Sequence, residues 1–549
     1  MKTKGFNRRE FLKLSSIALA GGYAGLHSTV AAAGRMGGGG MGGPRMGGGG
    51  VVDPPVGGLF ADPPVLRGIP GNEDMLGAYT LYSVEATESS VTVDGASAKV
   101  LTYLDRHDPA AALQTAFVCP TIVASPNERI RLQFRNSLQL GGTNLLGHVR
   151  DVTNMHVHGL HVSPEYDAMS GLPADNVHDV ILSRGDSAVY DYDLRYQRPG
   201  SMALYHPHVH GTVAEQFWGG LVGAIDVRDD LSFPELAPYA RNLLLLKDVT
   251  LSGGEPEPYT MLSEYMRGKE GNVVTVNGIV NPLLQVYPGD VRRFRILNVS
   301  NARFYRLSIE GHALHVIGAD GGLLDRPYEQ GEILLAPGER VDVLVKMTTT
   351  RGVYKLLSLP YARHGNMASA QTTLATLEVT KSAPGSVKPL PGLDNTEAVR
   401  ISDDLSLPRP RFTLSMGQGR GYINGIPFEV LADGSIRSFE HHSMAGTDEV
   451  WEIVNNSGMD HPWHQHVNDA QVLSITGGDA TFAKYAQFYG RVPAWKDTII
   501  IPKWGTVRLR IPIRDFDGMT MFHCHILEHE DIGMMGMWHI MGDGMPMGG

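Results

Sequence analysis

The sequence of 549 residues predicts an all-β protein built from three Greek-key β-sandwich domains. The first observation is a strand pattern, an acidic turn followed by a largely alternating run and then Asn, which recurs at intervals of roughly 160 residues. The second is that short alternating segments and turns fill the chain, with no long amphipathic helix. The third is the abundance of glycine, 66 residues, which favours turn-rich β structure. The three copies of the pattern are Glu128–Asn136, Gly289–Asn298 and Thr447–Asn455.

This rhythm predicts where the domains lie and which of them bind metal. We expect the first domain over residues 72–230, the second over 231–385 and the third over 386–549. Paired histidines follow the repeated strand in the first and third units, whereas the second has Arg303–Ser308 at that place, with no metal ligands. The outer domains are therefore predicted to hold metal, and the middle domain to act as a spacer without copper.

The N-terminus has the features of an export signal. Asn7–Lys13 contains a twin-arginine motif, an apolar stretch begins at Leu14, and small residues end at Ala33. We predict a twin-arginine signal peptide over residues 1–33, cleaved after Ala33, so that the protein is exported folded by the twin-arginine machinery to the periplasm or another extracytoplasmic space. The apolar stretch is too short and too interrupted by glycine to form a membrane anchor.

Residues 34–71 are predicted to be a disordered linker rich in methionine and glycine. From Met36 to Gly50 the chain is nearly all glycine, and such a composition buries too little apolar surface to fold. A flexible tether is the simplest interpretation. Because soft thioethers select Cu(I), capture of that ion is the alternative, and Met545 and Met547 repeat the theme weakly at the other end.

Charge and cysteine content narrow the function classes. The formal net charge is -11, and removing residues 1–33 leaves 42 basic and 57 acidic residues, a net charge near -15. Such a surface argues against nucleic acid as a partner. Of the two cysteines, Cys119 is predicted to be a small buried apolar residue, and Cys524 lies among potential metal ligands.

The segment His523–Met534 is the densest group of metal ligands in the chain. Two His, one Cys and a weak axial Met make a blue-copper electron-transfer site, and Cys524, His529 and Met534 supply three of these four ligands. In an extended segment His523 and His525 point to the opposite face from Cys524. The two histidines therefore reach a second metal centre from residues bonded directly to the cysteine of the first.

Four His-x-His pairs place imidazoles on common faces. In a strand the two histidines of such a pair share one face. Two pairs come from each outer domain, which implies a shared cluster where those domains meet, and eight imidazoles suit three metals better than one. His461, three residues before His464, completes the site that contains Cys524. The pairs are His156/His158, His206/His208, His464/His466 and His523/His525.

These blocks resemble the copper-binding blocks of three-domain multicopper oxidases, the family that contains laccases, bacterial cuprous oxidases and bilirubin oxidases. The resemblance covers the chain from about residue 72 and implies cupredoxin-like domains that hold four copper ions. It assigns the type 1 copper to His461, Cys524, His529 and Met534, and the type 2 copper to His156 and His464. It assigns the type 3 pair to His158, His206, His208, His466, His523 and His525.

The resemblance also implies the reaction. A donor is oxidised by single electrons at the type 1 site, and dioxygen is reduced to water at the cluster. Asp167 and Glu530 lie where the family keeps carboxylates that relay protons; hydrogen bonding to ligand imidazoles is the alternative role for such side chains.

The donor is less constrained by sequence. Cuprous oxidases carry a methionine-rich insertion, but residues 360–420 contain only Met367 and Met416, so a phenol or aromatic amine is the first expectation. A metal-ion oxidase acting on Cu(I) or Fe(II), with Met459 and Asp460 as a small site at the mouth, is the second. A copper-binding relative without turnover is the third, and we expect a monomer.

Overall fold

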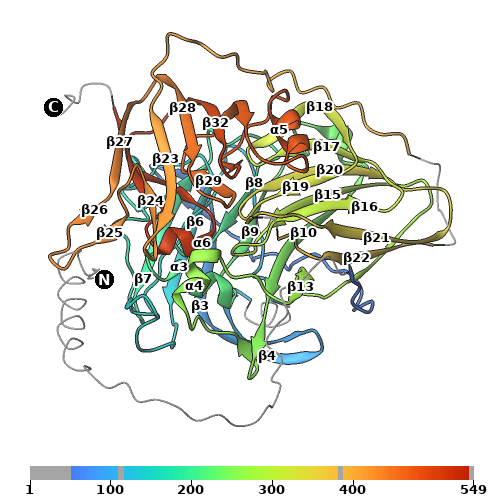
Figure 1. The fold of residues 1–549 in the computed structure, drawn as a ribbon, viewed down its shortest axis with the longest axis horizontal. Coiled ribbons are helices and arrows are strands. Elements are labelled where there is room, and N and C mark those ends of the chain that lie inside the picture. Colours follow the sequence, from blue (N-terminus) through green and yellow to red (C-terminus); the bar gives the residue numbers. More distant parts are fainter. Residues whose placement is uncertain (1–50, 109–116, 366, 381–387, 543–549) are drawn as a thin grey trace, which may run out of the picture.

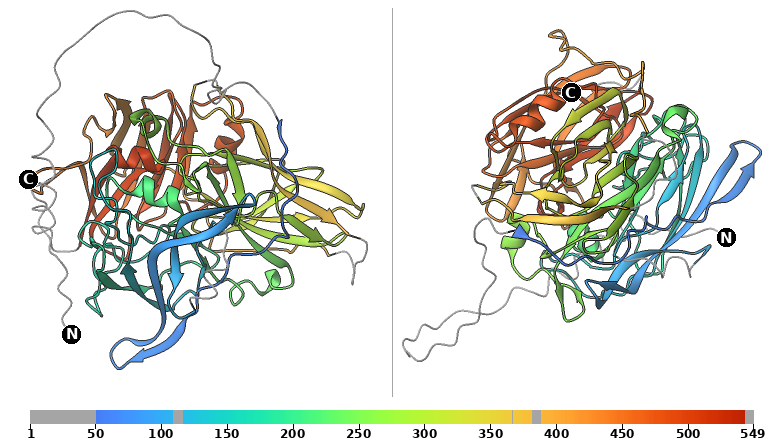
Figure 2. Two further views of the ribbon diagram at one scale, coloured as in Figure 1. Left: turned by 90° about the horizontal axis from the view of Figure 1, so that it is seen from below. Right: turned by 90° about the vertical axis from the view of Figure 1, so that its right-hand side faces the viewer.

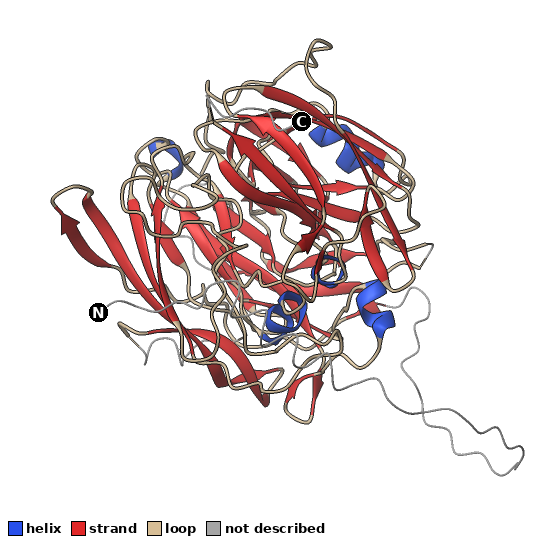
Figure 3. Cartoon of the chain, turned by 90° about the vertical axis from the view of Figure 1, so that its left-hand side faces the viewer, coloured by secondary structure: helices blue, strands red, loops and turns tan. Residues whose placement is uncertain are grey.

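The computed structural model describes residues 51–108, 117–365, 367–380 and 388–542. Strands dominate and the few helices are short, as Figure 3 shows. The chain forms three cupredoxin-like β-sandwiches, so the predicted fold class is confirmed. The predicted signal peptide and the tract from Met36 to Gly50 lie outside the described residues.

The first sandwich contains two sheets, and its long β3–β4 hairpin extends away from the body of the molecule (Figure 2). One sheet has the order β2-β3-β6-β7 with β4 paired to β3, and the other has the order β5-β9-β8. Their bounds are β2 Ile69–Glu73, β3 Gly77–Val93, β4 Ala96–Asp105, β5 Ile122–Ala124, β6 Arg129–Asn136, β7 Ser187–Asp193, β8 Met202–Tyr205 and β9 Gly223–Val227.

The second sandwich pairs two larger sheets, shown in yellow and green on the right of Figure 1. One comprises β1 (Val51–Val52), β14 (Leu283–Val286), β16 (Tyr305–Ile309), β19 (Ile333–Leu335), β21 (Gly352–Leu359) and β22 (Gln371–Val379). The other comprises β10 (Ala240–Val249), β13 (Val273–Val276), β15 (Val291–Asn298), β17 (Leu314–Ala319), β18 (Gly322–Gln330) and β20 (Arg340–Lys346).

The third sandwich, orange to red in Figure 1, has two five-stranded sheets. The first comprises β23 (Arg411–Gly417), β24 (Arg420–Ile423), β28 (Asp448–Asn455), β30 (Gln471–Thr476) and β32 (Thr506–Pro512). The second comprises β27 (Phe439–Met444), β29 (His461–Gln465), β31 (Thr498–Ile501), β33 (Gly518–Cys524) and β34 (Met535–Met541).

Short helices and two small hairpins complete the described chain. The hairpins are β11 (Leu251–Ser252) with β12 (Glu255–Pro256), and β25 (Glu429–Val430) with β26 (Ile436–Arg437). The helices are α3 (Val213–Gly219), η1 (Pro234–Leu236), α4 (Leu262–Arg267), α5 (Ala483–Tyr489) and α6 (Leu527–Asp531). None of the helices in these ranges is long and apolar enough to cross a membrane.

The three repeated segments of the sequence form equivalent strands. β6, β15 and β28 each pair in parallel with an earlier strand, β3, β10 and β23 respectively. Each also pairs antiparallel with a later strand, β7, β20 and β32. The internal repeat is therefore a repeat of sheet position, and the loop after each copy starts from the same place in its sandwich.

The asparagine that ends each copy explains why the pattern includes one. Its side-chain oxygen accepts from the backbone N–H two residues later, and its amide donates to two carbonyls of neighbouring loops, at 2.7–3.1 Å. The three residues, Asn136, Asn298 and Asn455, are buried. Buried loop carbonyls need such partners, so this side chain fixes where the following loop begins.

Part of the segment that was predicted to be a disordered linker is ordered in the structure. Residues 51–71 lie along the second sandwich and reach the first, which contradicts disorder in this part. Val51 and Val52 pair with β22, the N–H of Gly57 donates to Asn281, and Phe60 packs on the core. Backbone pairing with a sheet edge and one aromatic anchor order a segment whose composition alone suggested a tether.

The repeated asparagine gives a test of the fold. Asn298→Ala leaves one N–H and two carbonyls without their partner, and each unsatisfied buried group costs about 1–3 kcal/mol. We expect a clear fall in the calorimetric unfolding temperature of the metal-free protein. The control is Asn272→Ala, because Asn272 is exposed and its backbone N–H, which the substitution keeps, donates to Thr250. Equal unfolding temperatures for the two variants would contradict this role of Asn298.

Candidate metal centre

Two adjacent strands of the third sandwich present the ligand residues. In the antiparallel register of β29 and β33, Trp463 faces Cys524 and His464 faces His523. Because side chains alternate across a strand, Cys524 and His523 point to opposite faces of the sheet. α6 follows directly and returns His529 toward the thiol.

The first metal-ligating group is formed by His461, Cys524 and His529, all buried. Cys524 Sγ lies 3.4 Å from His461 Nδ1 and 3.5 Å from His529 Nδ1, and the two nitrogens are 3.2 Å apart. Met534 is buried beside them, since its carbonyl accepts from the N–H of Cys524 at 3.0 Å. The structure therefore brings one thiol and two imidazoles to a single place, and Met534 lies next to them along the backbone.

The second group contains all eight histidines of the four His-x-His pairs. In the first sandwich His156 and His206 exchange backbone hydrogen bonds, at 2.9 and 3.1 Å, which sets two pairs side by side. The pairs of the third sandwich are brought together by the register of β29 and β33. All eight side chains are buried. Its members are His156, His158, His206, His208, His464, His466, His523 and His525.

Imidazoles from the two outer sandwiches interleave. His158 and His464 stack with ring centroids 3.7 Å apart, and His156 and His466 stack at 3.9 Å. The Nε2 atom of His523 lies 3.2 Å from that of His208 and 3.3 Å from that of His466. The cluster thus belongs to the interface between the sandwiches, as the pairing of motifs predicted.

The hydrogen bonds of the ring nitrogens indicate whether these histidines are suited to bind metal ions. The Nδ1 atoms of His156, His206 and His464 contact Asp175, the carbonyl of Pro207 and the carbonyl of Asp497, at 2.8, 2.9 and 3.0 Å. Their Nε2 atoms are buried and have no hydrogen-bond partner within the described residues. Orphaned lone pairs in a buried site are costly unless something binds them, so these rings are arranged to ligate metal.

The electrostatics favour neutral imidazoles, which is the form that binds metal. Burial lowers the pKa of His206 to about 3 and, opposed in part by Asp497, that of His464 to about 4. Burial together with the Arg363 guanidinium lowers the pKa of His461 to about 3. Burial raises the pKa of the Cys524 thiol, so a thiolate at this position needs a bound cation.

Three buried carboxylates, Asp175, Glu530 and Asp497, contact cluster histidines. Asp175 accepts from His156 Nδ1 at 2.8 Å and lies 3.3 Å from His466 Nδ1, while Glu530 Oε2 lies 3.2 Å from His523 Nδ1. Glu530 Oε1 is 3.6 Å from His208 Nδ1, and neither of its oxygens has a well-aligned hydrogen bond among the described residues. Burial and the neighbouring Asp531 raise the pKa of Glu530 well above its ordinary value, which favours the protonated form of its carboxyl group.

Asp167, the other predicted relay residue, is held elsewhere. Its carboxylate forms an ion pair with Arg129 at 3.0 Å and accepts from the N–H groups of Met169 and Ser170. None of its hydrogen bonds or ion pairs in the described chain involves a cluster histidine. The structure brings Glu530 to the cluster but not Asp167, whereas Asp175, which was not among the predicted site residues, contacts two cluster histidines.

The middle sandwich contacts the cluster and is more than a spacer. Arg340 binds both oxygens of Asp497, at 2.6 and 2.5 Å, and its Nη1 lies 3.0 Å from His158 Nε2. Asp497 lies 3.0 Å from the same nitrogen, which leaves His158 Nδ1 free to ligate. Burial raises the pKa of Asp497, but the positive charge of Arg340 outweighs burial and holds it well below its usual range.

The middle sandwich also approaches through a glycine. At Gly338, with φ +81°, an added Cβ would lie 2.9 Å from His525 and 3.0 Å from His158. Only a residue without a side chain lets the backbone pass this close to two ligands. The sequence predicted a spacer because the second domain has no metal ligands of its own. That prediction did not consider residues, such as Arg340 and Gly338, that contact the ligands of the outer domains.

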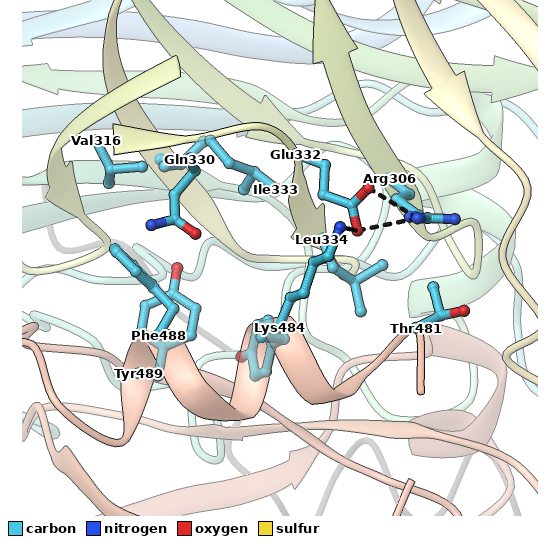
Figure 4. Close-up of a pocket in the computed structure, with 12 residues that line it drawn as sticks. Arg306, Val316, Gln330, Glu332, Ile333, Leu334, Thr481, Lys484, Phe488 and Tyr489 are labelled. Atoms are coloured by element: carbon cyan, nitrogen blue, oxygen red, sulfur yellow. Dashed lines mark hydrogen bonds and ion pairs between the residues drawn. The ribbon is translucent and has the colours of Figure 1, made fainter. Parts of the chain in front are cut away.

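The pocket in Figure 4 lies away from both groups. It is found between the second sandwich and α5, where Glu332 joins Arg306 and Lys484 at 2.7 and 3.0 Å. Its lining contains no candidate metal ligand. It is a seam between two sandwiches bridged by ion pairs.

The fold and the two ligand groups define a copper protein of three cupredoxin-like sandwiches. Family models described as multicopper oxidase match residues 96–232, 242–382 and 422–542. The chain therefore belongs to the multicopper oxidase family, as its motifs predicted, and is an oxidoreductase. Members of this family use copper, dioxygen and a reducing substrate.

Individual relatives agree with this assignment. The chain is 26% identical over 470 residues to the laccase of Bacillus subtilis, an alignment covering 76% of this chain and 88% of the relative. It is 28% identical over 464 residues to the laccase of Haloferax volcanii, covering 76% and 75%. The McoA multicopper oxidase of Aquifex aeolicus superimposes with a TM-score of 0.68 at 27% identity, covering 87% of this chain and 100% of that structure.

Three supporting residues were not found from the sequence. Asp175, Arg340 and Asp497 are single charged residues with no distinctive spacing from a histidine motif. Asp175 was within reach, because it lies on the loop after His158, but the nearer Asp167 competed with it. Nothing in the sequence near Arg340 indicated its role, because its partner Asp497 is 157 positions away in another sandwich.

Arg340 offers a test of the cluster's support. Arg340→Gln leaves Asp497 buried without its cation and frees His158, and loss of such a supporting group typically costs about 10–100-fold in metal affinity or activity. We expect lower copper content in the cluster while the cysteine site keeps its colour, measured by copper analysis and visible absorption. Arg326→Gln, at an exposed ion pair, is the matched control. Full copper content in Arg340→Gln would show that the guanidinium is dispensable.

Proposed function

We propose that the protein is a laccase-like multicopper oxidase that oxidises phenols or other small aromatic donors by single electrons and reduces dioxygen to water. Its four copper ions would be one type 1, one type 2 and a type 3 pair. The type 1 ligands would be His461, Cys524, His529 and Met534, and the type 2 ligands His156 and His464. The type 3 ligands would be His158, His206, His208, His466, His523 and His525.

The observation that carries this proposal is the covalent link between the two ligand groups. Cys524 belongs to one group, and its direct neighbours His523 and His525 belong to the other. With copper bound, the first site supplies one-electron oxidation of a donor and the second supplies four-electron reduction of dioxygen. The chain itself provides the connection, a few bonds of backbone and side chain, so no mobile carrier is needed between the two half-reactions.

Reduction of dioxygen to water also consumes four protons, and the chain has groups suited to deliver them. Asp175 and Glu530 are buried, contact different ligand imidazoles of the cluster, and have pKa values raised by burial. A protonated carboxyl beside the reacting centre is a general acid. We assign the relay to Asp175 and Glu530 in place of Asp167, whose carboxylate is paired with Arg129.

This assignment predicts a defect in one half-reaction. Asp175→Asn and Glu530→Gln should keep copper but slow reoxidation of the reduced protein by dioxygen, by about 10²–10⁴-fold, because an amide has no acidic proton to deliver. Anaerobic reduction by donor should stay near the wild-type rate. Both rates are measured by stopped-flow absorption.

Asp167→Asn is the matched control for these variants. It changes the same functional group on the same loop as Asp175, but the contacts of its carboxylate are with Arg129. We expect reoxidation at the wild-type rate. Slow reoxidation with full copper in Asp167→Asn would show that Asp167 relays protons after all. Loss of copper in Asp175→Asn would show that Asp175 only orients ligand imidazoles.

The rim of the cysteine site supports an aromatic donor. Ser457 Oγ lies 2.8 Å from His461 Nε2, and the N–H of Trp504 donates to the Ser457 carbonyl at 3.2 Å. The Trp504 side chain is 70% exposed, and its backbone has φ +55°, unusual for a bulky residue. Residues held in such conformations cluster at functional sites, and an exposed indole near a ligand imidazole offers an aromatic ring a surface to stack on.

The same rim is less suited to a metal ion. The Met459 thioether already accepts a hydrogen bond from Arg363 at 3.2 Å, and Asp460 accepts from Tyr361 and the N–H of Lys503, both at 2.7 Å. Metal-ion oxidation is the second candidate, favoured by His364, whose backbone bridges both Met367 and Met459.

Donor choice is tested by steady-state oxidation of Cu(I), Fe(II) and a phenol by the copper-loaded protein. We expect the phenol to have the largest kcat/KM, and Trp504→Ala to lower that value about tenfold or more, since base- and ring-stacking surfaces are worth roughly 1–3 kcal/mol. Oxidation of Fe(II) should change little. If Cu(I) is the best donor and Trp504→Ala has no effect on the phenol, the metal-ion function replaces the laccase-like one.

Export completes the proposal. The twin-arginine sequence at Arg8-Arg9 supports transport in the folded state to the periplasm or an equivalent space, with the protein acting there as a monomer.

A further inference from the structure

One face of the second sheet of the third sandwich carries methionines in register. β33 and β34 pair so that Met521 faces Met537 and Met519 faces His539, and the next rung inward joins His523 to Met535. On the other side of β34, the parallel strand β27 places Glu440 beside Met537, His442 beside His539 and Met444 beside Met541. Because alternate residues share a face, these rungs form a single row of thioethers and imidazoles.

The row runs from the surface to the copper cluster. Its inner rung contains His523, a cluster histidine, and Met535, and its second rung contains Met521 and Met537; these four side chains are buried. The three methionines pack together with Val177 and Phe428, and Met519 packs against them. The outer rungs are open: His442 is exposed, and His539, Met519 and Met541 are half-buried. A continuous line of soft donors therefore connects solvent with a ligand of the cluster.

The outer end has the ligands of a metal site. His442 and His539 lie with ring centroids 4.7 Å apart and planes within 16° of parallel. His539 Nε2 is a buried atom without a hydrogen bond among the described residues, and it lies 3.5 Å from Glu440 Oε2. Glu165 of the first sandwich also reaches this rung, since its carboxylate accepts from the N–H of Met519 at 2.8 Å. Two imidazoles and a thioether from three adjacent strands thus meet beside two carboxylates.

We infer that this outer rung is a cuprous-ion binding site through which copper enters the protein. Thioether and imidazole together suit Cu(I), a soft ion, better than harder divalent ions. Turning the exposed imidazole of His442 about its side-chain bonds brings its nitrogen toward that of His539. The negative charge of Glu440 and Glu165 draws a cation to the rung, and Met519, Met537, Met521 and Met535 offer successive soft contacts toward His523. No electron is transferred in this step.

The inference rests on copper being the metal of this protein and not on the identity of the donor. It also differs from the function of the ten ligand histidines, since none of His442, His539 and Met519 belongs to either ligand group. Donor oxidation and cuprous binding are measured separately, so failure of one leaves the other unaffected.

The binding test uses the full chain, loaded with its copper ions and reduced, under anaerobic conditions. Cu(I) is added in competition with bicinchoninate, a chromogenic chelator. The His442→Gln/His539→Gln variant should bind one cuprous ion fewer than wild type, and Met519→Leu should weaken that equivalent at least about tenfold, in the range seen for lost metal-site contacts. Methionine-rich tracts at the termini are the same in all variants and cancel in the comparison.

The matched control is His107→Gln/His315→Gln, which removes two partly exposed histidines of the first and second sandwiches. It should bind as many cuprous ions as wild type. Equal stoichiometry in wild type and the His442→Gln/His539→Gln variant would overturn the site, and an equal loss in the control would show that any surface histidine suffices.

The entry role is tested on metal-free protein. Met537→Leu keeps the volume and apolar character of the second rung but removes its sulfur. We expect copper uptake from a cuprous donor to be several-fold slower, with the same final copper content and unfolding temperature, followed by copper analysis of desalted samples. Met347→Leu, a buried methionine of the second sandwich, is the control. Uptake at the wild-type rate in Met537→Leu would overturn entry through this row.

Discussion

The alternation of side chains across strand β33 is the constraint on which the rest of the structure depends. A strand sends successive residues to opposite faces, so Cys524 reaches the first ligand group while His523 reaches the second. His525 joins the same cluster just beyond the strand end. Two redox centres are thereby fixed at a separation of a few bonds by backbone geometry alone. α6 then returns His529 to the thiol side and Glu530 to the cluster side within one turn.

Each outer sandwich supplies half of the cluster, so their relative position is a functional requirement. Fully buried charged residues of the second sandwich fix this relative position. Arg340 joins Asp497, and Lys496 joins Asp320 and Glu339 at 3.0 Å each, across the boundary between second and third sandwiches. Removing one member of such a network leaves an uncompensated buried charge, which is far more costly than an exposed pair. The second sandwich thus fixes the geometry of two ligand groups whose members come from the outer sandwiches.

The sequence predicted the fold class, and it predicted the histidines and the cysteine that the structure gathers in two groups, because both depend on local patterns. A strand that ends in Asn136, Asn298 or Asn455 is visible as a repeat, and His-x-His spacing shows which imidazoles share a face. The supports were not predictable in the same way. Arg340 and Asp497 become significant only when segments far apart in the chain meet, and the contact of Asp175 with His466 likewise joins two different sandwiches. The sequence also did not predict that residues 51–71 are ordered, because the strand β22 that pairs with Val51 and Val52 lies some 320 positions away.

The central claim is that Cys524 connects a donor site to a dioxygen site. The most direct measurement compares wild type with Cys524→Ser after copper loading, with visible absorption recorded during anaerobic addition of donor and then of dioxygen. Wild type should be blue, lose its colour with donor and regain it with dioxygen, whereas Cys524→Ser should lack the colour and consume no dioxygen with donor present, even though its cluster histidines still bind copper. Intense visible absorption or donor-dependent dioxygen uptake in Cys524→Ser would contradict the account.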